Sequence, residues 1–170
     1  MKGSTLYPPL KEIPSIIMEI ENWTIKKVLE MGAEMELEGY NMYMEHAEQT
    51  EYPGASRLFK KLAADEERHR EYFLKGLEDP ESIEVRTLEE NVPDLKITDR
   101  LINVPLDPKA DFPQILKFAA QREAATYDFY IQIAGKFEGT KWGKMFHNFA
   151  LEELKHKKLL EEEYDDITGW

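Results

Sequence analysis

The chain has 170 residues, a length typical of a single domain, and its hydrophobic fraction of 42% is enough to form a core. Its formal net charge is −12, which disfavours nucleic acid and anionic membranes as partners. The absence of cysteine excludes disulfides, thiolate-bound metals, iron–sulfur clusters and cysteine nucleophiles among these residues. No signal peptide and no bilayer-spanning apolar run is recognisable, so we expect a soluble cytoplasmic protein with no membrane partner.

The first half of the chain predicts an irregular leader followed by a pair of helices. Residues 1–23 are interrupted by three prolines and form the predicted leader, with one short helical turn near residues 15–20. The first helix pair is predicted at residues 24–77. Thr24 is the predicted N-cap of a helix that ends near Gln49, and the break at residues 51–54 precedes the second helix.

A long segment, residues 78–110, separates the two predicted helix pairs and contains four prolines. Neighbouring antiparallel helices need only a few connecting residues, so a segment of this length requires another explanation. Extended chain covers roughly 3.3 Å per residue, which is enough to run along a whole helix. We therefore predict one long crossover between the second and third helices, which is the connectivity of ferritin-like bundles.

The second helix pair is predicted at residues 111–164. Asp111 is the predicted N-cap of its first helix, and Gln114 stands where a capping box requires it. The dipeptide at 139–140 separates this helix from a fourth one that begins near Lys141. The predicted fold is an all-α, ferritin-like, antiparallel four-helix bundle, and residues 1–170 form a single domain.

Six residues of the types that bind metals recur at a fixed offset of 87 positions. Each half of the chain supplies one glutamate from its first helix and a Glu-x-x-His motif from its second. Apolar and aromatic residues around these motifs match at the same offset, so the repeat concerns whole helix pairs. The set consists of Glu36, Glu66 and His69, which recur as Glu123, Glu153 and His156.

The four glutamates are predicted to lie near the middle of their helices, about 18 Å from each helix start. Antiparallel helices of similar length align their midpoints, and each histidine lies one turn from its glutamate on the same face. Four ionised carboxylates in an apolar interior require cations, and two divalent ions neutralise them. Oxygen-rich ligands with two imidazoles suit iron or manganese, and zinc also occupies such sites.

A single Glu-x-x-His on a solvated helix face is unremarkable, so the matched pair of motifs carries the metal hypothesis. His46 and His147 have no counterpart in the repeat and are interpreted as surface or packing residues. Tyr43 and Tyr130 lie seven residues after the lone glutamates, where they are either core residues or hydrogen-bond donors to a ligand carboxylate.

Two further carboxylates directly precede the ligand glutamates of the second and fourth helices. Asp65 and Glu152 could accept the free N–H of the opposite histidine, or they could simply face solvent. The sequence alone leaves both alternatives open.

These motifs resemble the rubrerythrin branch of the ferritin-like di-iron proteins. The resemblance covers about residues 24–164. The matching stretches are Ala33-Glu34-Met35-Glu36 with Tyr43, Asp65-Glu66-Glu67-Arg68-His69, Ala120-Gln121-Arg122-Glu123 with Tyr130, and Glu152-Glu153-Leu154-Lys155-His156.

The resemblance implies two iron ions that react with hydrogen peroxide or O₂, an external electron-donor protein, a role in oxidative stress and a homodimer. It also implies roles for the six residues: Glu36 and Glu123 as terminal ligands, Glu66 and Glu153 as bridging ligands, and His69 and His156 as one ligand to each ion.

The chain departs from the rubrerythrin pattern in two respects. It lacks the four cysteines of a rubredoxin-like domain, and Thr126 stands where rubrerythrins tend to carry an extra glutamate.

The alternatives to peroxide or O₂ reduction that remain are ferritin-like iron oxidation and handling, and a bundle that metal stabilises without turnover.

Overall fold

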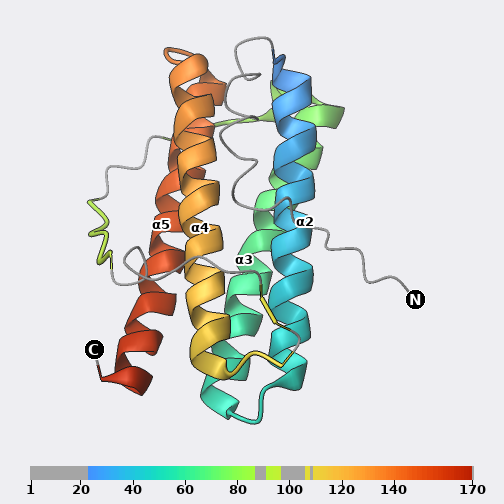
Figure 1. Ribbon diagram of the computed structural model, residues 1–170. Coiled ribbons are helices and arrows are strands. Elements are labelled where there is room, and N and C mark those ends of the chain that lie inside the picture. The colour runs from blue at the N-terminus through green and yellow to red at the C-terminus, as the bar shows by residue number, and fades with distance from the viewer. Residues whose placement is uncertain (1–22, 87–90, 97–105, 108, 170) are drawn as a thin grey trace. The chain divides into compact units, whose positions relative to one another are not determined.

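The computed structural model describes residues 23–86, 91–96, 106–107 and 109–169. In these ranges the chain forms four α-helices and one short 3-10 helix and contains no strand, so the all-α, four-helix-bundle class is confirmed (Figure 1). The predicted turn at residues 15–20 lies outside them. The elements are α2 (Ile25–Gln49), α3 (Pro53–Glu78), η2 (Pro80–Ser82), α4 (Phe112–Lys136) and α5 (Lys141–Thr168).

The chain divides into two compact units, Met1–Glu84 and Val85–Trp170. Each unit contains one antiparallel helix pair joined by a short connection, α2 with α3 in the first and α4 with α5 in the second (Figure 1). The helix pairs thus follow the predicted halves of the repeat, and the single domain over residues 1–170 stays a prediction.

The first unit begins with the predicted cap. The Thr24 hydroxyl accepts a hydrogen bond from the Lys27 backbone N–H at 3.2 Å, which satisfies a donor that the first turn of α2 leaves unpaired. Helix α3 begins at Pro53, two residues earlier than predicted. Proline suits the first helical position because its missing N–H has no partner there in any case.

Helices α2 and α3 approach closely at Gly32. A Cβ atom on Gly32 would lie 2.9 Å from Cε2 of Phe73, a side chain with no exposed surface. The repeat places Ala119 and Leu160 at the corresponding positions of the second unit, and both are fully buried. The first unit therefore combines a glycine with a large aromatic residue, and the second combines an alanine with the smaller leucine.

The second unit also begins as predicted, with a complete capping box. The Gln114 N–H donates to Asp111 Oδ1 at 2.9 Å, and the Asp111 N–H donates to Gln114 Oε1 at 2.8 Å. Helix α5 continues to Thr168, so the predicted end at residue 164 is wrong. Residues 164–168 contain no glycine or proline that would end the helix. The helix ends at Gly169, whose φ of +69° lies in the left-handed region.

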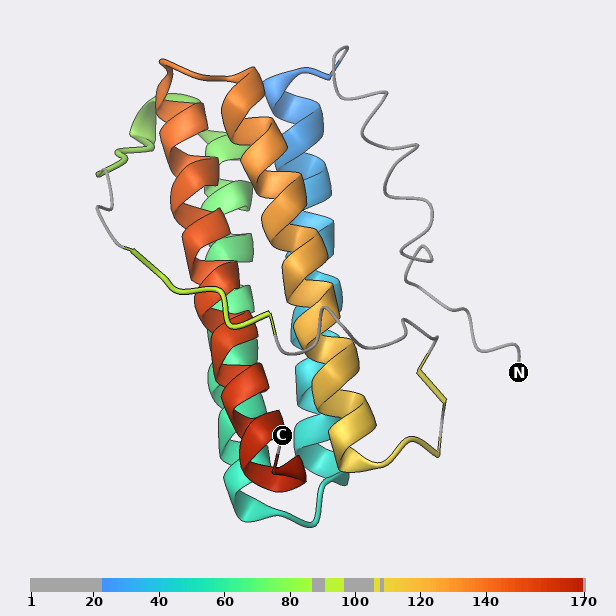
Figure 2. The same cartoon turned by 60° about the vertical axis from the view of Figure 1, so that its left-hand side comes forward.

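Within the second unit, residues 91–96 of the crossover pass over α5 (Figure 2). The carbonyl of Arg86 accepts a hydrogen bond from Asn148 Nδ2 at 2.6 Å. Further along, Asp94 Oδ1 pairs with the Lys157 ammonium at 2.5 Å. The two contacts are nine residues apart on α5, or about 14 Å, so Arg86 and Asp94 each lie beside this helix at well-separated levels.

No helix of the described residues is long and apolar enough to cross a bilayer.

Substituting Gly32→Ala should lower the free energy of unfolding by about 1–3 kcal/mol, because the new methyl group meets the buried Phe73 ring. The double variant Gly32→Ala with Phe73→Leu copies the residues of the second unit and should recover most of the loss. Urea denaturation of both variants measures this. Equal destabilisation of the single and double variants would contradict the packing account.

Candidate metal centre

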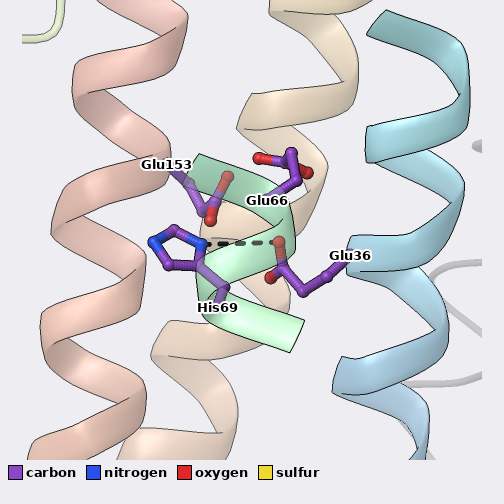
Figure 3. Close-up of side chains that lie close together, drawn as sticks. All are labelled: Glu36, Glu66, His69 and Glu153. Carbon is purple, nitrogen blue, oxygen red and sulfur yellow. Dashed lines mark ion pairs between the residues drawn. The ribbon is translucent and has the colours of Figure 1, made fainter. Parts of the chain in front are cut away.

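The first unit buries three of the six predicted ligands together. Glu36 on α2 and both Glu66 and His69 on α3 have no exposed surface. His69 Nδ1 lies 3.4 Å from Glu36 Oε2, as the dashed line in Figure 3 marks. One ligand atom from each residue lies within 4.8 Å of the others, so the three donors form a half-site.

The second unit repeats this arrangement with its own three residues. Glu123 on α4 and Glu153 on α5 have no exposed surface, and His156 on α5 is 4% exposed. His156 Nδ1 lies 3.4 Å from Glu153 Oε2 and 3.9 Å from Glu123 Oε2. One ligand atom from each of these three residues also lies within 4.8 Å of the others. Each helix pair therefore forms a half-site of two carboxylates and one imidazole.

Comparison with known families identifies the family of the chain that carries these half-sites. The rubrerythrin family model matches residues 27–164. This stretch contains all six predicted ligands and the four helices, except for the first two residues of α2 and the last four of α5. The chain belongs to the rubrerythrin family. No curated protein and no solved structure gave a significant match. Membership implies a di-iron carboxylate protein with redox chemistry that generally involves peroxide.

The donor set fits the metal that the rubrerythrin family implies. Carboxylate oxygens with imidazole nitrogens suit iron and manganese and also accept zinc. Two carboxylates buried beside each other carry like charges, which an apolar interior makes costly unless a cation lies between them. The buried glutamates and histidines of each unit can therefore bind a metal ion, and either half-site supplies three protein ligands to it.

The two half-sites differ in the residues beside the lone glutamate. Arg122 precedes Glu123, is 9% exposed, and places Nη1 3.6 Å from Glu123 Oε1. The repeat puts Met35 at the corresponding position of α2. The repeat does not predict this contact, because its matched positions contain Met35 in one half and Arg122 in the other. The signal that could have revealed it is the replacement of an uncharged Met35 by a charged Arg122 beside otherwise equivalent ligands.

Thr126 lies one helical turn after Glu123 and is 3% exposed. Its hydroxyl donates to the Arg122 carbonyl at 3.2 Å, so its proton is engaged within α4. Thr126 supplies a neutral hydroxyl where rubrerythrins tend to carry the extra carboxylate. The α4–α5 half-site therefore keeps two carboxylates, the same number as its counterpart.

The predicted supporting tyrosines are core residues in the structure. Tyr43 and Tyr130 have no exposed surface. Tyr43 stacks on Phe59 with ring centroids 5.9 Å apart, and Tyr130 lies 5.5 Å from Phe146, its equivalent under the repeat. Their packing role is thus observed, and hydrogen bonding to a ligand carboxylate stays a prediction.

Asp65 has a partner on its own helix. The Arg68 guanidinium lies 3.5 Å from Asp65 Oδ1 through Nη2, and the same nitrogen lies 3.4 Å from His69 Nε2. Arg68 thus lies between Asp65 and the histidine of the same helix. Contact of Asp65 or of Glu152 with the opposite histidine stays a prediction.

The two remaining histidines lie in different environments. His147 is exposed, whereas His46 is 9% exposed and packs against Phe59 with ring centroids 6.0 Å apart. Burial lowers the pKa of His46, and the nearby Glu45 opposes this shift. His46 Nδ1 has no hydrogen-bond partner among the described residues, and the repeat places Ile133 at its equivalent position. His46 is thus a neutral packing residue.

Glu153→Gln should stabilise the protein in chelator, because it removes one of two like charges buried in the α4–α5 half-site. The expected gain in the free energy of unfolding is about 1–3 kcal/mol. With saturating Mn(II) the order should reverse, since the variant loses a ligand. Thermal unfolding with and without metal measures both effects.

Glu163→Gln is the matched control, because this glutamate of α5 is only partly buried and lies ten residues from Glu153, so the change should alter stability little in either condition. A loss of stability for Glu153→Gln in chelator would contradict the account. It would show that a protonated His156 already balances the charge of Glu153.

Proposed function

We propose that the two half-sites assemble into one di-iron centre. Glu36 and Glu123 would each bind one ion terminally, and Glu66 and Glu153 would bridge the ions. His69 and His156 would each complete the coordination of one ion. The equal ligand set of the two units, its burial and the family match support this proposal.

The reaction that this centre suits best is the reduction of hydrogen peroxide or O₂. When bound, two ferrous ions would supply two electrons, which suffice to reduce hydrogen peroxide to water or O₂ to peroxide. The chain's own side chains hold the four carboxylates in place and exclude water from around them. Phe59 and Phe146 belong to this buried core and pack on Tyr43 and Tyr130.

We propose a separate protein as the electron donor, and the 170 residues contain no cysteine that could hold a rubredoxin-type iron. A cytoplasmic homodimer that protects against oxidative stress is the biological setting that we propose with this activity.

Burial of all six ligand-type residues is the observation that carries the proposal. Iron oxidation and handling is kept as the second candidate because Thr126 replaces the carboxylate that rubrerythrins tend to have there. That function should produce a multi-subunit shell that accumulates mineral. A purely structural metal would instead stabilise the helix pairs without any reaction with peroxide.

Anaerobic loading with Fe(II) should give two irons per chain. Addition of peroxide to the loaded protein should oxidise both irons within one turnover, and a chemical reductant should restore the ferrous state. Glu66→Gln should lower the iron content and slow the oxidation by at least about tenfold, because one removed ligand commonly costs several kcal/mol in such sites. Iron analysis and stopped-flow near-UV absorbance measure both.

Glu67→Gln is the control for this experiment, because Glu67 is the exposed neighbour of Glu66 on the same helix. It should behave like the wild type. Two tightly bound irons that ignore peroxide would contradict the redox proposal and favour the structural role. Continued uptake of iron into a shell would favour iron handling.

A further inference from the structure

We propose that Arg122 makes the two metal positions unequal, so that the ion in the α4–α5 half-site is held less tightly than the ion in the α2–α3 half-site. In this proposal Arg122 is a positioning residue that acts through Glu123. The inference rests on the proposed function, because it concerns the ions of that centre.

The contact between Arg122 and Glu123 divides the two oxygens of the carboxylate. Oε1 lies 3.6 Å from Arg122 Nη1, whereas Oε2 lies 3.9 Å from His156 Nδ1. Glu123 therefore directs one oxygen to the guanidinium and the other to the donors of the half-site. This arrangement favours binding of an ion through Oε2 alone.

The charge on Arg122 is permanent and poorly screened. A guanidinium stays protonated in proteins, and the Arg122 side chain is only 10% exposed. Buried charges interact more strongly than exposed ones, because solvent and salt screen them less. The α4–α5 half-site therefore has two carboxylates and one adjacent buried cation.

The α2–α3 half-site has no equivalent buried cation among the described residues. Met35 occupies the position of Arg122 under the repeat, and it carries no charge. Arg68 lies near His69, but its side chain is 53% exposed and it also pairs with Asp65. Water screens the charge of such a side chain, so it has little effect on a bound ion.

The other buried cation of the second unit is already balanced. Lys157 lies 2.5 Å from Asp94 Oδ1 and 3.6 Å from Glu161 Oε1. Two carboxylates thus surround this ammonium, and its net effect on a neighbouring ion is small. Arg122 remains the feature that distinguishes the two half-sites in formal charge.

Two consequences follow for a divalent ion. The guanidinium repels the cation and competes for the negative charge of Glu123, and both effects weaken binding at the α4–α5 half-site. The α2–α3 position should therefore fill first. The second ion should bind more weakly and exchange more readily.

Calorimetric titration of the metal-free full chain with Mn(II) under anaerobic conditions tests this inference. The wild type should show two binding events whose Kd values differ by about tenfold or more, which corresponds to about 1.4 kcal/mol. Arg122→Met copies the residue of the other half and should bring the two Kd values together by tightening the weaker event. Arg122→Lys keeps the charge and should preserve the separation.

The swap variant Met35→Arg provides an independent check, because it should weaken the tighter event instead. Arg57→Met, which removes an exposed arginine of α3, is the control and should leave both events unchanged. Far-UV circular dichroism of each variant measures whether it is folded. If Arg122 had only a structural role, its substitution would reduce the folded fraction but leave the ratio of the two Kd values unchanged.

Equal Kd values in the wild type would overturn the inference and leave the di-metal centre intact. So would an unchanged separation in Arg122→Met together with no weakening in Met35→Arg. Binding of fewer than two ions per chain would contradict the di-iron proposal as well. The two failures are therefore distinguishable.

Discussion

Two buried carboxylates beside one imidazole in each helix pair are the constraint on which the rest of this structure depends. Like charges in an apolar interior are unfavourable, and they persist only where a cation can compensate them. Glu36 and Glu66 in one unit, and Glu123 and Glu153 in the other, have no exposed surface. A set of charges that costs stability without metal is easiest to understand as a metal site.

The packing around each half-site serves this constraint. Each of the six proposed ligands lies well inside its helix, away from the frayed ends. Aromatic pairs at equivalent positions, Tyr43 with Phe59 and Tyr130 with Phe146, pack in the core of each unit. The close approach at Gly32 sets the spacing of α2 and α3, and with it the distance between Glu36 and His69.

Much of this architecture could be predicted from the sequence, because the signals were local. Thr24 and Asp111 cap their helices as their residue types predict, and the fixed offset of 87 positions identified the two equal ligand sets. The end of α5 was misjudged because the sequence near residue 164 offers no strong stop before Gly169.

Contacts between distant or adjacent residues were less predictable. The pairing of Asp94 with Lys157 joins residues far apart in sequence, and no periodic pattern identifies it. The contact of Arg122 with the adjacent Glu123 was not predicted either, because the repeat has no counterpart for it in the first half. The burial of His46 depends on its packing against Phe59, which its own helix does not specify. Tertiary packing decides all three, and the repeat carries no information about them.

The central claim is that the two helix pairs share one centre, and the magnetism of the oxidised iron tests it most directly. Low-temperature electron paramagnetic resonance of the fully oxidised, two-iron protein should show almost no signal, because two adjacent ferric ions couple to a non-magnetic ground state. One-electron reduction should then produce the signal of a coupled mixed-valence pair. A strong signal from isolated high-spin ferric ions, equal to the iron content, would contradict the account and show that each helix pair binds its ion separately.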